Sequence, residues 1–217
     1  MRFARDAQTG LLVPQRDIRV MPGLDRAHLQ WFAVENGFIA ATPTGRYGDA
    51  EGNLDHERPW GSLFVVPGSG TFNVTEIGCY AYYAGTSNIK LSIWEHDAEN
   101  NNPDTIVTSS DTDPVALPGA MAKVYFTYGT QPQVTGGTTY WICVEQSSAD
   151  RMSYFATGGT SVYINGGMTY PTWPTPAQWD TVSDLVWDTS LYAVIEAAGE
   201  GGGSSVALIS EQRRRRG

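Results

Sequence analysis

Short runs of β-branched and aromatic residues, separated by turn-forming residues, dominate the sequence from Trp60 onward. The chain has 217 residues and contains 24 glycines and 12 prolines. Many of them fall between these runs, where they favour turns rather than the continuation of a strand or helix. This punctuation predicts an all-β fold made of many short strands.

The runs are numerous enough for two packed sheets. With 41% hydrophobic and only 17% charged residues, the chain has the composition of a folded protein, and its length suits one domain with appendages. We therefore expect one antiparallel two-sheet β-sandwich, jelly-roll-like, over residues 59–198. The expected strands are 63–66, 71–83, 88–94, 105–108, 123–128, 138–145, 152–156 and 190–196.

Two of these runs carry information about faces and register. In 88–94, Ile89, Leu91 and Ile93 alternate with polar residues, which predicts one face toward the core and one toward solvent. In 71–83 the apolar phase slips between Val74 and Ile77. A β-bulge near Thr75 would account for this slip.

Both ends of the chain differ from the middle. Residues 1–58 mix polar, glycine and proline residues with isolated apolar ones, and only 24–34 has helical character. We interpret 1–58 as an extended N-terminal arm that lies along a partner or along neighbouring subunits, because such a long irregular stretch is unusual inside a compact domain. Its apolar side chains would then be partner contacts, chiefly Trp31, Phe32 and Phe38, with Ile39 beside them.

Residues 199–217 form a short C-terminal tail. A Gly-rich linker at 199–205 precedes an apolar segment at 206–209 and four basic residues, Arg213, Arg214, Arg215 and Arg216. The arginines fit three interpretations: a solvated end, a contact with nucleic acid, or a contact with an acidic surface such as another copy of this chain. The apolar segment could add a strand to an exposed sheet edge.

Aromatic residues crowd the long connection between the last two expected strands. Aromatic rings can stack on sugars, but they also cap small sandwich cores and anchor subunit interfaces. The sequence leaves these three uses open. The candidate glycan contacts are Trp94, Tyr163, Tyr170, Trp173, Trp179 and Trp187.

The sequence offers no anchor for catalysis. His28, His56 and His96 are scattered and lack metalloenzyme spacing, and no nucleophile elbow, P-loop or dinucleotide fingerprint is present. The acidic loop 96–104 contains oxygen ligands without the spacing of a calcium loop. We therefore expect no enzyme, no cofactor and no metal site. Cys79 and Cys143 lie far apart and favour two buried free thiols over one disulfide.

The net charge and the hydropathy of the chain argue against two classes of partner. A net charge of −9 disfavours nucleic acid as a partner of the domain body, because such binding needs clustered lysine and arginine. The N-terminus has no apolar segment typical of a secretory signal, and no stretch approaches the length of a membrane span. We therefore expect synthesis in the cytoplasm and no membrane partner.

Three segments resemble a carbohydrate-binding-module-like jelly roll that is common in phage and bacterial surface proteins. They are 72–80 (FNVTEIGCY), 89–94 (IKLSIW) and 136–144 (GGTTYWICV). The likeness covers about 60–198 and carries no ligand residues to named positions.

Together with the arm and the tail, this resemblance implies a non-enzymatic virion protein of a phage: a capsid decoration protein, head spike or tail fibre module. It would be made in the host cytoplasm and would attach to other virion proteins through its arm. It would also tend to form a homo-oligomer and could contact a glycan. The alternative is a carbohydrate-binding module of a cellular or secreted protein.

Overall fold

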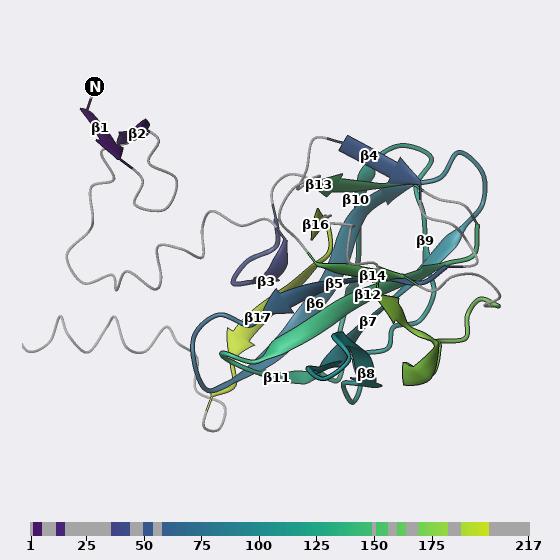
Figure 1. Cartoon of the computed structure of the whole chain (residues 1–217). Helices are drawn as coiled ribbons and strands as arrows, with labels where there is room; N and C mark the ends of the chain where they lie inside the picture. The colour runs from purple at the N-terminus through teal and green to yellow at the C-terminus, as the bar shows by residue number, and fades with distance from the viewer. Residues whose placement is uncertain are drawn as a thin grey trace, which may run out of the picture.

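The computed structural model describes residues 2–5, 12–15, 36–43, 50–53, 58–148, 151–155, 160–163, 169–181 and 188–199 (Figure 1). Nearly all of the regular structure in them is β. No helix among these residues is long and apolar enough to cross a membrane. The elements are β1 (Arg2–Arg5), β2 (Leu12–Gln15), β3 (Gly37–Ile39), β4 (Ala50–Asn53), β5 (Trp60–Val65), β6 (Thr71–Tyr82), β7 (Asn88–Asp97), β8 (Asn102–Ile106), β9 (Val115–Ala116), β10 (Ala122–Thr127), β11 (Gln133–Thr135), β12 (Thr139–Gln146), β13 (Arg151–Phe155), β14 (Ser161–Tyr163), η1 (Pro176–Gln178), β15 (Asp180–Thr181), β16 (Asp188–Thr189) and β17 (Tyr192–Ala197).

Two sheets pack face to face, as the strand-like runs predict. The larger sheet has the order β16-β13-β6-β17-β3, with β10 and β11 paired to the other side of β6 and β4 paired to β13. The smaller has the order β15-β14-β5-β12-β7-β8, with β9 paired to β7. The pairings are antiparallel except that of β17 with β3, which is parallel. Every one of the eight runs identified in the sequence overlaps a strand.

The bulge expected near Thr75 is present. In the ladder between β6 and β17, Val194 pairs with Glu76 and Ile195 with Val74, so Thr75 has no opposite residue. Its hydroxyl donates a hydrogen bond to the carbonyl oxygen of Val194, at 3.3 Å. The extra residue restores Val74 and Ile77 to the core face, where both are fully buried.

The main core lies between the two sheets. The larger sheet contributes Val74, Ile77 and Cys79, and the smaller contributes Ile89, Leu91, Ile93, Ile142 and Val144. Cys143, one residue from Val144, points away from this core and belongs to a second cluster on the outer face of the smaller sheet. Both cysteines are therefore buried free thiols, the arrangement that their spacing favours.

Strands β1 and β2 form a separate two-stranded antiparallel sheet, in which Arg2 pairs with Gln15 and Arg5 with Leu12. The sequence did not predict strands there. The helical segment considered at 24–34 lies outside the described residues, as do Trp31 and Phe32.

The last part of the expected arm belongs to the sandwich, which corrects the interpretation of Phe38 and Ile39 as partner contacts. Strand β3 runs parallel to β17 at the edge of the larger sheet (Figure 1). Phe38 and Ile39 are 6% and 4% exposed, and the Phe38 ring packs edge-on against Tyr140 with 6.0 Å between centroids. The chain therefore buries these side chains itself.

Gly37 permits this insertion. Its φ is +72°, and a β-carbon there would lie 2.7 Å from the Phe64 ring. A larger residue would force β3 away from β5, because both the backbone conformation and the space favour glycine. Three hydrogen bonds fasten the segment: Gly37 N to Leu191 O at 2.8 Å, Asn36 Nδ2 to Thr189 O at 3.3 Å, and Thr42 Oγ1 to Glu76 Oε2 at 3.4 Å.

Phe38→Ala should lower the free energy of unfolding by about 3 kcal/mol, because it deletes a buried ring and leaves a cavity. Urea denaturation followed by circular dichroism measures the change. Val65→Ala is the control: Val65 is 60% exposed, and its truncation should cost less than about 0.5 kcal/mol. Equal stability of the Phe38 variant and the wild-type protein would place Phe38 outside the core.

Candidate functional site

The outer face of the smaller sheet is buried, contrary to the alternation seen in the sequence. Ile89, Leu91 and Ile93 face the core as predicted, but Lys90 and Ser92 on the opposite face are only 9% and 0% exposed. The long connection after β14 returns across this face. We call residues 169–181, the described part of that connection, the cover segment.

Aromatic contacts attach the cover segment to the sheet. Trp94 meets Trp179 and Trp173 edge-on, with centroid distances of 5.6 and 6.0 Å. Trp141 and Cys143 of β12 complete this second cluster beneath them. Trp94 and Trp179 are 2% and 4% exposed, so their rings are not available for stacking on a sugar in this structure. Trp94, Trp173 and Trp179 therefore act as a cap, one of the three uses that the sequence left open.

A charged group lies beside this cluster. Lys90 and Glu145 are direct partners across β7 and β12. Lys90 Nζ lies 3.0 Å from a carboxylate oxygen of Asp111, 3.4 Å from the carbonyl oxygen of Pro171 and 5.7 Å from the centre of the Trp173 ring. The Trp173 indole N–H also donates to Asp111, at 2.6 Å. Lys90 and Asp111 thus join the sheet to the cover segment.

Glu145 is the member of this group whose buried carboxyl lacks a bonding partner among the described residues. It is 1% exposed, and neither carboxyl oxygen has a hydrogen-bond partner among the described residues. Burial raises the pKa of Glu145 to about 7, with Lys90 opposing the rise and Asp111 adding to it. Lys90 faces two carboxyl groups and bonds to Asp111, so its charge only partly offsets the effect of burial on Glu145.

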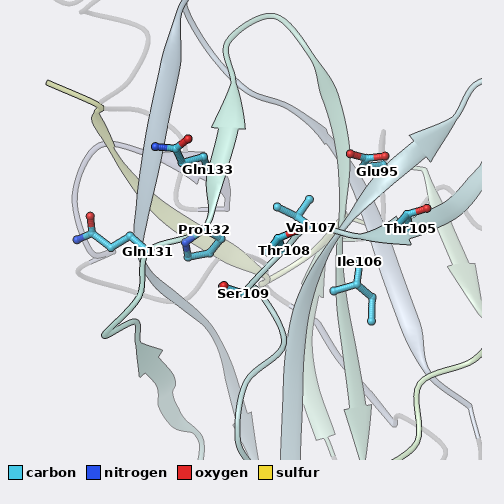
Figure 2. Close-up of a pocket in the computed structure, with 9 residues that line it drawn as sticks. All are labelled: Glu95, Thr105, Ile106, Val107, Thr108, Ser109, Gln131, Pro132 and Gln133. Carbon is cyan, nitrogen blue, oxygen red and sulfur yellow. The ribbon is translucent and has the colours of Figure 1, made fainter. Parts of the chain in front are cut away.

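A groove opens at one side edge of the sandwich (Figure 2). Its volume is about 440 Å³, within the range of small-ligand sites. Residues of β7, β8 and the following turn form one wall, and 131–133 form the other. The polar lining residues are Glu95, Thr105, Thr108, Ser109, Gln131 and Gln133, and the apolar ones are Ile106, Val107 and Pro132.

The walls of the groove are fixed by hydrogen bonds to the sandwich. Val107 N donates to Ile93 O at 2.8 Å, and Val74 N donates to Pro132 O at 2.8 Å. Ser109 lies between these anchors with φ of +66°, an uncommon backbone conformation for a residue other than glycine. None of the nine lining residues is a lysine or an arginine. The groove therefore presents hydroxyl, amide and carboxylate groups without a cation.

The acidic loop beyond β7 forms a turn. Asp97 Oδ1 accepts hydrogen bonds from the backbone N–H of Glu99 at 2.8 Å and of Asn100 at 3.3 Å, and Asn100 Nδ2 donates to Asp97 Oδ2 at 2.6 Å. These bonds, the side chain of Asn100 first, lower the pKa of Asp97. Among the described residues, no three histidine, cysteine, aspartate or glutamate side chains form a group that could hold a metal ion.

The remaining residues singled out in the sequence do not form one site. Tyr170 and Trp173 are partly exposed on the cover segment. Tyr163 belongs to β14, but its side chain lies outside the description. Trp187 and Arg213 to Arg216 lie outside the described residues.

Sequence reasoning missed the groove and Glu145. No spacing rule joins Glu95 to Gln131, because they line one groove only after the strands have folded. Glu145 did carry a signal: it continues the alternation of Trp141 and Cys143, which places it on the same face as two apolar residues.

No protein-family model matches the chain, and no curated protein is significantly similar to it.

Stability should depend on pH through Glu145. Its pKa is raised from 4.5 to about 7 in the folded chain, so the unfolded chain releases this proton first. The contribution is most favourable below about pH 4.5 and declines as the pH rises to about 7, by up to roughly 3 kcal/mol. Glu145→Gln should remove this decline and leave the variant more stable than the wild-type protein at pH 8. Urea denaturation at pH 5, 6, 7 and 8 measures the difference.

Glu196→Gln is the matched control, because Glu196 is an exposed carboxylate on β17, in the other sheet. Its substitution should leave the decline that Glu145 causes in place. Identical pH profiles for the wild-type protein and the Glu145 variant would show that the buried carboxyl does not titrate between pH 4.5 and 7.

Proposed function

We propose that this protein is a non-enzymatic structural protein of a phage virion, as a capsid decoration protein, head spike or tail fibre module. It attaches to other virion proteins through the arm that precedes β3 and displays the β-sandwich. Copies of the chain assemble with one another through the same arm.

The anchoring of the arm carries this proposal. Residues 36–43 join the sandwich through β3, whose parallel ladder to β17 pairs Gly37 with Tyr192 and Val194 with Ile39. Phe38 adds a buried ring to the main core. A force on the residues that precede β3 is therefore transmitted to the larger sheet rather than to a loop. Such an attachment suits a segment that holds a domain on a particle.

The composition of the groove favours binding or assembly over hydrolysis. Of its nine lining residues, Glu95 is the one with an ionisable side chain. Glycoside hydrolysis commonly uses two carboxyl groups that flank the scissile bond, and acyl transfer uses a nucleophile beside a base. These lining residues include one carboxyl group, and no hydrogen bond joins Glu95 to a hydroxyl group among them.

A carbohydrate-binding module remains the second candidate, but a specific observation weakens it. The rings of Trp94 and Trp179, two of the six aromatic residues that suggested a glycan platform, are buried under the cover segment. Trp173 is partly exposed, and its indole N–H is bonded to Asp111. Saturable glycan binding by a monomeric protein would favour this second candidate.

Deletion of residues 2–35 tests the arm directly. The shortened chain retains β3 and the buried Phe38, so we expect it to keep its fold and its thermal unfolding midpoint while it loses the self-association of the full chain. Circular dichroism reports the fold, and sedimentation velocity over a range of concentrations reports the mass.

Deletion of residues 2–41 is the companion control. It removes β3 together with its ladder and should destabilise the sandwich. A full-length chain that stays monomeric at every concentration, or a chain lacking 2–35 that assembles as the full chain does, would overturn the proposed role of the arm.

A further inference from the structure

The edge groove lies within the most acidic part of the described chain. Residues 91–122 contain six carboxylates, at positions 95, 97, 99, 104, 111 and 113, and no lysine or arginine. Lys90 engages Asp111 at 3.0 Å. Glu95 lines the groove, and Asp104 is exposed on β8 beside two lining residues, Thr105 and Ile106. A ligand for this groove should therefore be cationic along at least one part.

The C-terminal tail leaves the sandwich close to this groove. Ala198 N donates to Thr71 O at 3.0 Å, on one side of β6. Thr71 also pairs with Thr135 of β11 on the other side, and Gln133 of the same strand lines the groove. Neighbouring strands lie about 4.8 Å apart, so the start of the tail lies roughly 10 Å from β11.

The tail has the length and the chemistry to reach the groove. The eight residues 199–206 extend to at most about 28 Å, more than twice the separation of about 10 Å across β6. The apolar segment 206–209 matches the apolar lining of Ile106, Val107 and Pro132. The four positive charges of Arg213 to Arg216 complement the carboxylates of Glu95 and Asp104 on this surface.

We propose that the C-terminal tail docks in the edge groove of its own sandwich. Residues 206–209 lie against the apolar lining, and the four arginines lie beside Glu95 and Asp104. This docking does not depend on the proposed role of the arm, because arm and tail are separate segments. It makes the groove a site that the chain itself fills and that an external partner must compete for.

Hydrogen exchange of the full chain tests the docking. The variant in which Arg213 to Arg216 are all serine should exchange the amides of 104–109 on the order of tenfold faster than the wild-type protein at low salt, since each exposed ion pair contributes a factor of a few. At about 1 M salt, where the screening length is about 3 Å, the two proteins should converge. The protection should not depend on protein concentration, because the contact is intramolecular.

Charge exchange provides the stringent control. Glu95→Lys with Asp104→Lys should also remove the protection, and combining it with Arg213 to Arg216 changed to glutamate should restore it. Thr127→Lys adds a positive charge at an exposed position on β10 and should leave the exchange unchanged. Equal exchange in the wild-type and serine variants would overturn the docking. Protection that rises with protein concentration would overturn the intramolecular contact and assign the groove to the tail of a second copy.

Discussion

Hydrogen bonds to one long strand, β6, hold the larger sheet together. This strand pairs with β10 and β11 along one side and with β17 and β13 along the other. The close approach at its centre requires Gly78, because a β-carbon there would lie 2.5 Å from both the Tyr192 hydroxyl and the Val124 carbonyl oxygen. The Tyr192 hydroxyl passes over Gly78 and donates to Glu76 at 2.7 Å. The bulge at Thr75 then sets the phase of the strand, so packing in the main core depends on two local features of β6.

The smaller sheet differs from the larger one because both of its faces are covered. Its inner face packs against the larger sheet, and its outer face packs under the cover segment. Covering both faces increases the buried apolar area, but it also encloses the polar side chains that an antiparallel sheet usually turns to water. Ser92 accepts the Trp94 indole N–H at 2.6 Å, and Lys90 reaches Asp111. The carboxyl oxygens of Glu145 have no such partner among the described residues, and burial therefore raises its pKa.

Local sequence patterns predicted the main strands. The residues that these patterns misassigned are placed by contacts between segments far apart in the sequence. Apolar alternation and turn residues located the main strands, and a slip of phase located the bulge at Thr75. The same alternation failed for Lys90 and Ser92, because the chain that covers them comes from about 80 residues later in the sequence. Phe38 was assigned to the arm for a similar reason: β3 has three residues, too few to show a period, and its pairing with β17 is a distant contact. The groove had no sequence signal, since its walls meet only after the sheets have packed.

Because β3 and β17 are parallel, the arm enters the larger sheet at one end and the tail leaves it at the other. Parallel strands run in the same direction, so the chain enters β3 beside Tyr192 and leaves β17 at the opposite end, beside Thr71. The 131–133 wall of the groove lies at this second end, because Gln133 pairs with Asn73 and Pro132 accepts a hydrogen bond from Val74. A tail seated in the groove would therefore occupy the end of the larger sheet where the arm does not enter. Attachment through the arm and occupation of the groove by the tail are then spatially compatible. A neighbouring protein that binds the arm at one end of the sheet need not displace the tail at the other end.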